Sequence, residues 1–338
     1  MIKINNKFAL GCLIQWYEIE IIEEYLRSVK KSLDNIDNKK NIIIDLYFNT
    51  SQVLEKINNN ETSISNIKNK YQKLLKDIFN YDDEIVTLVG SDYNIRLHTN
   101  EHDKQIYTIA DYRREFNDKY CDSVDVLMWG ETDSILPSQT FEVLDNLHDQ
   151  VKNTTPKYVS FFGICKMWDE SWKILEHPDF TDKPFIENDY DNWWSLKYTM
   201  TSDEMYKINE KVQELDVRTL NQFKFNGCGL VISSDIVKAG VNIPRSVFFV
   251  HEDTAFQNSL IRLFGNTIPQ YVIKNILLVH NRNHPKKRMY IKDEIKDGTM
   301  NEKRRSNDWY VRANKMCEHN AYNIFNQEKI FTWEDVFK

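Results

Sequence analysis

Glycine, proline and cysteine are scarce in this sequence, and its apolar runs are short. Only 9 of the 338 residues are glycine and 7 are proline, and no segment rich in glycine, proline or serine marks a flexible linker. The five cysteines are odd in number and form no Cys-x-x-Cys pair, which favours reduced thiols over a disulfide framework. The apolar run that ends before Gln15 is too short for a signal peptide, and no run approaches the length that spans a bilayer. These features predict a cytoplasmic protein.

Positive charge is not in excess either. The chain has 44 Lys and Arg against 51 Asp and Glu, which gives a formal net charge of -7. Such a chain does not bind nucleic acid through its overall field, although a local basic patch remains open. Hydrophobic residues make up 41% and charged residues 28%, as in ordinary globular proteins. The length suits one large domain with an appendage, or two modest domains.

Short apolar runs alternate with longer amphipathic segments along the chain. The expected buried strands are Phe8–Ile14, Ile42–Phe48, Ile85–Val89, Val124–Trp129, Tyr158–Ile164, Gly229–Ser233 and Ile276–His280. The expected helices are Glu18–Leu33, Ile64–Phe79, Tyr107–Tyr120 and Gln139–Val151. This alternation predicts an α/β fold with a mostly parallel central sheet that helices cover on both faces. In such sheets ligands bind beyond the carboxyl ends of the strands, so polar residues at those ends are candidates for a site.

Two carboxylates follow one of these strands directly. Glu131 and Asp133 are two residues apart, so in an extended segment both side chains point the same way. Oxygen ligands of this kind suit Mg²⁺ or Mn²⁺, which keeps positions open for phosphate oxygens. A solvated acidic loop is the alternative interpretation of this pair. A second acidic pair, Glu252–Asp253, and a strand that ends at His280 follow later and favour the metal site.

The order of these landmarks resembles that of the nucleotide-sugar-dependent glycosyltransferases of the GT-A fold, nearest to the inverting enzymes of family 2. The resemblance covers roughly residues 8 to 290. Its landmarks are a first strand and helix that ends at Ser32-Leu33, a helix with Asp111, Arg113, Arg114 and Asn117, the segment Trp129-Gly-Glu131-Thr-Asp133, a strand that begins Asn226-Gly227-Cys-Gly, and Glu252–Asp253. The first acidic position is Glu131 where the family pattern has Asp. No Gln-x-x-Arg-Trp motif occurs, which argues against a polymerising synthase.

The resemblance implies a GT-A-like (Rossmann-like) sheet, a nucleotide-sugar donor, most often a UDP- or GDP-sugar, and Mn²⁺ or Mg²⁺ as cofactor. It divides the chain into a nucleotide-sugar-binding part (1–168), an acceptor-binding part (169–290) and a C-terminal extension (291–338). The acceptor-binding part contains an aromatic-rich insertion, and the extension is expected to return to the body of the protein.

The resemblance also implies roles for individual residues. Glu131 and Asp133 would bind the metal, with His280 as a third ligand or else as a structural histidine. Asp253 would be the general base; alternatively Glu252 is the base and Asp253 caps a helix that begins at Thr254. The residues expected to bind the donor are Gln15, Asn49, Asp111, Arg114, Asn117, Trp129, Lys286 and Arg288, with a solvated basic run as the alternative for the last two. Those expected to bind the acceptor are Trp193, Trp194 and Gly227, with a place in the core as the alternative for the two tryptophans.

Two other functions remain open at this point. A sugar nucleotidyltransferase also uses acidic residues and a metal on an α/β sheet, but its glycine-rich phosphate loop is not evident around Gly11. A non-catalytic carbohydrate-binding protein would explain 8 Trp and 17 Tyr but not the paired acids. The acceptor of a transferase could be a glycan, a lipid-linked sugar, a protein side chain or a hydroxymethylated DNA base. A DNA acceptor would require the basic segments 286–288 and 303–305 to contact phosphates.

Overall fold

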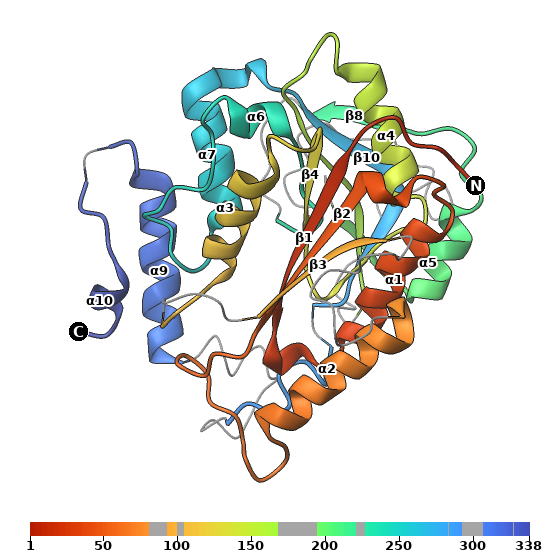
Figure 1. The fold of residues 1–338 in the computed structure, drawn as a ribbon. Helices are drawn as coiled ribbons and strands as arrows, with labels where there is room; N and C mark the ends of the chain where they lie inside the picture. The colour runs from red at the N-terminus through yellow and green to blue at the C-terminus, as the bar shows by residue number, and fades with distance from the viewer. Residues whose placement is uncertain are drawn as a thin grey trace.

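The computed structural model describes residues 1–80, 93–99, 105–167, 195–220, 227–282, 284–292, 307–326 and 328–338 (Figure 1). The strands are β1 (Phe8–Gln15), β2 (Ile42–Asn49), β3 (Asn94–Thr99), β4 (Val126–Gly130), β5 (Ser134–Ile135), β6 (Val159–Lys166), β7 (Ser195–Thr199), β8 (Val217–Leu220), β9 (Val231–Ser233) and β10 (Gln270–His280). The α-helices are α1 (Ile22–Asp34), α2 (Ile64–Phe79), α3 (Ile109–Tyr120), α4 (Thr140–Val151), α5 (Ser202–Asn209), α6 (Ser234–Lys238), α7 (Glu252–Phe264), α9 (Asp308–Asn323) and α10 (Trp333–Val336). Short 3₁₀ helices occupy Trp16–Glu18, Lys39–Asn41 and Gly265–Thr267.

The strands form one sheet in the order β3-β2-β1-β4-β9-β6-β10-β5, with β7 paired to β6 and β8 paired to β10. β1 is parallel to β2 and β4, and β6 is parallel to β10. β9 is antiparallel to both β4 and β6, so β1, β2, β4, β6 and β10 all run in the same direction. The predicted mostly parallel sheet is therefore confirmed, and the carboxyl ends of these strands share one edge.

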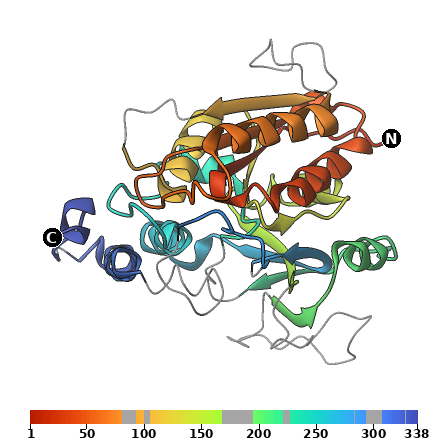
Figure 2. The ribbon, with the colours of Figure 1, turned by 90° about the horizontal axis from the view of Figure 1, so that it is seen from below.

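Helices cover both faces of the sheet, as the sequence predicts (Figures 1 and 2). Along β1, Phe8 and Leu10 face a core formed with α1, α2, α4 and α5, whereas Ala9 and Leu13 face a second core formed with α3, α6 and α7. Both faces of β1 are thus buried, which explains its continuous apolar sequence. Among the described residues no helix combines the length and the apolar character needed to cross a membrane.

Several boundaries differ from the sequence prediction. The segment expected to be one helix over residues 18–33 begins with a 3₁₀ turn, and α1 starts only at Ile22. β10 starts at Gln270, earlier than the expected Ile276. The polar pair Lys274 and Asn275 interrupts the apolar run, and a register shift between Ile273 and Leu277 accommodates this pair within the strand. No strand was expected between residues 164 and 229, yet the described part of this segment, 195–220, adds β7 and β8 to the sheet. The expected strand 85–89 lies outside the described residues.

A buried carboxylate fixes the outer strands to α3. Asp45 of β2 accepts hydrogen bonds from the ring of His98 on β3, at 2.8 Å, and from the hydroxyl groups of Tyr112 and Tyr120 on α3, at 2.9 and 2.5 Å. Burial alone raises the pKa of Asp45, but the hydrogen bond and charge of His98, together with Tyr120 and Lys119, hold it below its ordinary value. The network holds β2 and β3 against α3. This helix carries Arg113, which lines the pocket described below.

The C-terminal extension packs on the body through α9, which lies beside α7 in both views (Figures 1 and 2). Ala313 and Cys317 of α9 are fully buried against Phe248 and Phe249, which precede α7. The amide of Asn258 on α7 donates a hydrogen bond to the carbonyl of Ala321 at 3.1 Å. The described part of the extension is therefore anchored next to the first turn of α7.

Candidate active site

A pocket of about 510 Å³ opens at the edge where the parallel strands end. Its walls come from the ends of β1, β2 and β10, the turn after β4, the first turns of α3 and α7, and α9. The charged and amide residues that line it are Gln15, Glu18, Asn49, Glu55, Arg113, Glu131, Asp133, Glu252, Asp253, His280, Arg282 and Lys287. This agrees with the rule that open α/β sheets bind ligands beyond the carboxyl ends of their strands.

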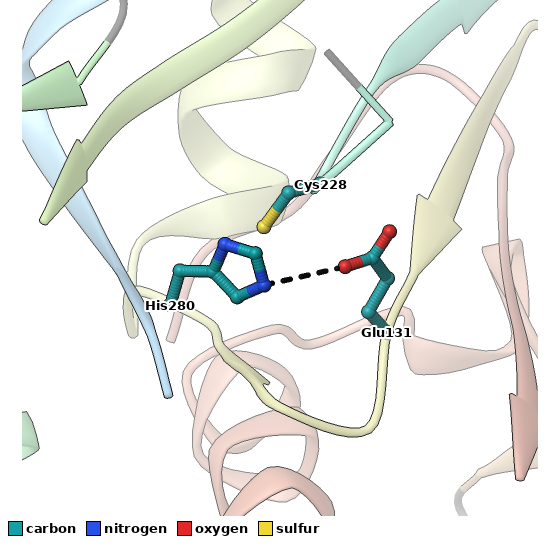
Figure 3. A group of neighbouring side chains, drawn as sticks. All are labelled: Glu131, Cys228 and His280. Atoms are coloured by element: carbon teal, nitrogen blue, oxygen red, sulfur yellow. Dashed lines mark ion pairs between the residues drawn. The ribbon is translucent and has the colours of Figure 1, made fainter. Parts of the chain in front are cut away.

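One side of the pocket gathers the carboxylates of Glu131 and Asp133 and the imidazole of His280. Figure 3 shows Glu131 and His280 together with Cys228. Oε2 of Glu131 lies 3.5 Å and Oδ2 of Asp133 lies 3.6 Å from Nε2 of His280. The two acids come together with the histidine because Ser134, which follows them, pairs with His280 in the antiparallel ladder of β5 and β10. The structure thus brings together the three residues that the sequence suggested as metal ligands.

The donor set of this group fits a divalent cation. The ligand atoms of Glu131, Cys228 and His280 lie within 4.8 Å of one another, and within the described residues no hydrogen bond engages Nδ1 of His280. Although burial alone lowers the pKa of His280, interactions with Cys228 and Asp133 raise it to about 10, so this position is built to stabilise positive charge. Carboxylate oxygen and imidazole nitrogen suit Mn²⁺ or Mg²⁺, whereas the Cys228 thiol is a softer ligand and is within 2.9 Å of the Ser134 hydroxyl.

A lysine already contacts one of these carboxylates. Nζ of Lys287 lies 2.7 Å from Oδ2 of Asp133 and 3.4 Å from Oε1 of Glu18. Burial raises the pKa of Asp133, but the neighbouring Lys287 and His280 hold it well below its ordinary value. A cation at Asp133 therefore has to share this carboxylate with the ammonium group or displace it.

Arg113 connects this side of the pocket with the opposite side. Its side chain is 1% exposed, and its guanidinium donates to Oε1 of Glu131 at 2.7 Å, to Oε1 of Glu252, and to the carbonyl of Gly227 at 3.1 Å. The guanidinium also lies over the ring of Trp129, 4.8 Å from its centroid. A Cβ atom on Gly227 would lie 2.7 Å from Nη1 of Arg113, so glycine is needed for this close approach.

Glu252 and Asp253 form the first turn of α7 on the opposite side. Burial raises the pKa of Glu252 to about 7, against the opposing effect of Arg113. Asp253 is half-buried, and its Oδ1 accepts a hydrogen bond from the backbone amide of Thr254 at 2.7 Å. The alternative in which Asp253 caps a helix that begins at Thr254 is wrong, because α7 begins at Glu252 and His251 is its N-cap.

Asp111 and Arg114, which were expected to bind the donor, do not line the pocket. Oδ2 of Asp111 accepts the backbone N–H and the hydroxyl of Thr108, and so forms the capping box of α3. The guanidinium of Arg114 donates to the carbonyls of Ile243, Pro244 and Val247, at 2.8 to 3.1 Å. These contacts fix the start of α3 and the loop before α7, and the adjacent Arg113 faces the pocket instead.

Asn117 and Trp129 are also buried away from the pocket. The indole N–H of Trp129 donates to Oδ1 of Asn117 at 2.9 Å, and the amide of Asn117 donates to Asn242 at 2.9 Å. The ring of Trp129 packs edge-on against Phe256 of α7. Trp129 therefore packs against Arg113 and α7, and Asn117 fixes the orientation of its indole ring.

The basic segment after His284 is divided by its turn. Lys286 is exposed and does not line the pocket, whereas Lys287 does. Arg288 is 1% exposed, pairs with Glu55, and lies over the ring of Tyr17 at 4.2 Å. Lys286 and Arg288, which were expected to bind the donor, therefore do not line the pocket, and Lys287 between them does.

The other expected residues divide into two groups. Gln15, Asn49 and Gly227 line the pocket. Trp193 and Trp194 lie outside the described residues. The sequence did not predict Trp309 and Tyr310, which line the pocket from α9. It also did not predict Cys228, although this residue lies between Gly227 and Gly229 in the acceptor-side strand motif, and that position could have identified it.

No protein-family model matches this chain, and no curated protein matches its sequence. Solved structures with a similar backbone include S. aureus TarS 1-349, at 10% identity and a TM-score of 0.44, with 96% of this chain and 76% of that chain covered. They also include glucosyl-3-phosphoglycerate synthase from Mycobacterium tuberculosis in complex with Mg²⁺ and uridine-diphosphate, at 8% identity and a TM-score of 0.43, with 96% and 82% covered. A third is 4-diphosphocytidyl-2C-methyl-D-erythritol synthase from Anaerococcus prevotii, at 10% identity and a TM-score of 0.36, with 80% and 89% covered. At such identities the similarity concerns the arrangement of the backbone.

Proposed function

We propose that the protein is a metal-dependent glycosyltransferase that transfers a sugar from a nucleotide-sugar donor to a hydroxyl group. One observation carries the proposal: a single pocket holds Glu131, Asp133 and His280 on one side and Glu252–Asp253 on the other. The first group suits a cation and a diphosphate, and the second suits proton transfer. A transferase needs both, on opposite sides of the sugar that moves.

The donor would lie along the ends of β1 and β2 with its diphosphate towards Glu131 and Asp133. Mn²⁺ or Mg²⁺, held by Glu131, Asp133 and His280, would neutralise the charge that develops on the leaving diphosphate. Gln15 and Asn49 line the part of the pocket where the base and ribose would lie. The amide of Asn49 donates to the carbonyl of Tyr107 at 3.1 Å, which fixes the wall between β2 and α3.

Asp253 is the proposed general base of an inverting transfer. Glu252 is bound by Arg113, whereas within the described residues no hydrogen bond engages Oδ2 of Asp253. Oδ2 would accept the proton of the acceptor hydroxyl while that oxygen bonds to the anomeric carbon and the bond to the diphosphate oxygen breaks. Such assistance contributes about 10²–10⁴-fold to a rate.

The proposal is tested by incubating the protein with Mn²⁺ and a panel of UDP-, GDP- and CMP-sugars and measuring the released nucleotide. Asp133→Ala should abolish metal-dependent donor binding, measured by calorimetry. Asp77→Ala, which removes an exposed carboxylate on α2, is the matched control. Unchanged donor binding and nucleotide release in Asp133→Ala would contradict the metal site.

The base is tested separately. Asp253→Asn should bind the donor with wild-type affinity and lose nucleotide release, because the amide cannot accept the proton. Retained release would assign the role to another residue. Release of pyrophosphate from a nucleoside triphosphate and a sugar phosphate, without release of nucleotide from any nucleotide-sugar, would instead identify a sugar nucleotidyltransferase.

A further inference from the structure

We propose that Trp309 and Tyr310 of the C-terminal extension form the acceptor subsite, and that the acceptor is a neutral carbohydrate whose ring packs on them. This inference rests on the proposed transferase function and adds the class of acceptor to it. Both residues lie in the first turn of α9 and line the same pocket as Asp253.

A buried phenylalanine fixes the two rings. Phe249 is 4% exposed, and its ring centroid lies 5.5 Å from those of Trp309 and Tyr310. Trp309 and Tyr310 also contact each other, with ring centroids 5.8 Å apart and planes at 73°. The two rings are half-buried and meet at an angle, so they form a preformed corner rather than a flat surface.

The position of this corner points to the acceptor rather than to the nucleotide. Phe249 and Val250 line the pocket immediately before Glu252 and Asp253, so the corner rests on the segment that carries the proposed base. The expected nucleotide-binding residues Gln15 and Asn49 are at the ends of β1 and β2 instead. An acceptor must place its hydroxyl against the base, and a ring that packs on Trp309 or Tyr310 is held on that side of the pocket.

The chemistry of the corner suits a sugar. Tryptophan and tyrosine offer an apolar ring face together with a polar N–H or O–H group, which matches the C–H face and the hydroxyl groups of a pyranose. A polyanionic acceptor such as DNA fits less well, because the chain has a net charge of -7. Three basic side chains, Arg113, Arg282 and Lys287, line the pocket, and carboxylates engage Arg113 and Lys287.

The corner is also held rigidly. Ala313 and Cys317 bury one face of α9, and the amide of Asn320 donates to the carbonyls of Ser246 and Phe331 at 2.7 and 2.8 Å. A subsite whose side chains are fixed before binding loses little conformational entropy when the ligand arrives. The extension thus completes the pocket from a segment more than fifty residues after the base.

The test measures carbohydrate binding and donor binding separately. Binding of neutral hexose and N-acetylhexosamine oligosaccharides is first screened on a glycan array without donor, and the best binder is then titrated by calorimetry. Trp309→Ala and Tyr310→Ala should each weaken that binding at least tenfold, whereas the donor affinity should stay at the wild-type value. Trp309→Phe should recover part of the loss, because it restores a ring.

Trp333→Phe is the matched control. Trp333 packs against Phe248 and Phe249 in the same aromatic cluster but does not line the pocket, so this change should leave glycan binding unaltered. Thermal unfolding midpoints of all variants report whether a loss of glycan binding reflects misfolding. If Trp309→Ala does not fold, Tyr310→Ala provides the test of the subsite.

Wild-type glycan binding by Trp309→Ala and Tyr310→Ala would overturn the inference. So would loss of donor affinity in these variants, since the rings would then hold the nucleotide. Glycosylation of an oligonucleotide with hydroxymethylated bases, with no glycan bound, would overturn it as well. Trp309-dependent glycan binding without nucleotide release from any donor would support the subsite and contradict the proposed transferase.

Discussion

Replacement of Arg113 by methionine tests whether the ion pairs of this residue hold the two sides of the pocket together. Arg113 is bound to Glu131 and to Glu252, which is 7% exposed. Removing one partner of a buried ion pair costs about 3–5 kcal/mol, because the remaining charge is left without compensation. Methionine can fill most of the space that the arginine side chain occupies beside Trp129, so the lost packing is small. We expect the free energy of unfolding to fall by about 3–5 kcal/mol at pH 8.

The loss should depend on pH through Glu252. Its pKa in the folded protein is about 7, above the ordinary value of 4.5, so its neutral form favours folding. The stability from this shift is fully present below pH 4.5 and is lost as the pH rises through about 7. Without Arg113 the pKa of Glu252 rises further, and each further unit costs about 1.4 kcal/mol at high pH. The variant should therefore differ less from wild type at pH 5 than at pH 8.

Urea unfolding followed by circular dichroism at pH 5 and pH 8 measures both effects. The control combines Arg113→Met with Glu252→Gln, which removes the uncompensated charge and should restore much of the stability at pH 8. A loss below about 1 kcal/mol at pH 8 would refute the reasoning, since a buried ion pair would then contribute no more than a surface pair. An equal loss at both pH values would show that Glu252 is not the group involved.

Three further variants test other contacts. Asp45→Asn should lower the free energy of unfolding by about 2–4 kcal/mol at pH 7, because buried hydroxyl donors lose a charged acceptor. The effect should disappear in acid. The pKa of Asp45 is lowered in the folded protein, so its contribution to stability is present above the ordinary pKa of 3.8 and is lost as the pH falls through the pKa of the folded state. Urea unfolding at pH 7 and in acid checks this. Lys287→Met should tighten Mn²⁺ binding up to about tenfold in calorimetry without donor, because the ammonium no longer competes for Asp133, and unchanged or weaker binding would contradict this. Gly227→Ala should lower the unfolding midpoint and nucleotide release, because the new methyl group would lie 2.7 Å from Nη1 of Arg113; wild-type values in both assays would disprove the close approach.

Much of the sheet could be predicted because burial on both faces leaves a direct mark on a strand. β1 appears as a continuous apolar run and β2 as an apolar run that only Asp45 interrupts before its last residue. α2 coincides with its predicted range because its apolar residues recur at helical spacing. The antiparallel direction of β9 could not be predicted. A three-residue strand, buried throughout, has the same sequence pattern whichever way it runs.

The candidate site could be predicted only where its residues follow strand ends or begin a helix. Glu131, Asp133, His280 and the Glu252–Asp253 pair were identified in this way, because the carboxyl ends of parallel strands meet at one edge.

Which of two neighbouring basic residues lines the pocket could not be predicted from the sequence. Adjacent helical residues diverge by about 100°, so helical spacing alone does not separate Arg113 from Arg114. The family pattern favoured Arg114, but that residue binds the loop at 243–247 and Arg113 lines the pocket instead. Lys287 rather than Lys286 faces the pocket, because the turn that contains both residues directs the side chain of Lys287 towards Asp133.

The sequence by itself determined the α/β class, the edge of the sheet where the candidate site lies and the acidic residues at that edge, because these depend on local periodicity and on the order of elements. Only the tertiary structure decided that Arg113 joins the two sides of the pocket and that Trp309 and Tyr310 close it. Those contacts join residues far apart in the chain, and they depend on how α3 and α9 pack against α7. No local pattern records such packing, since a buried aromatic residue and one that lines a pocket look alike in the sequence.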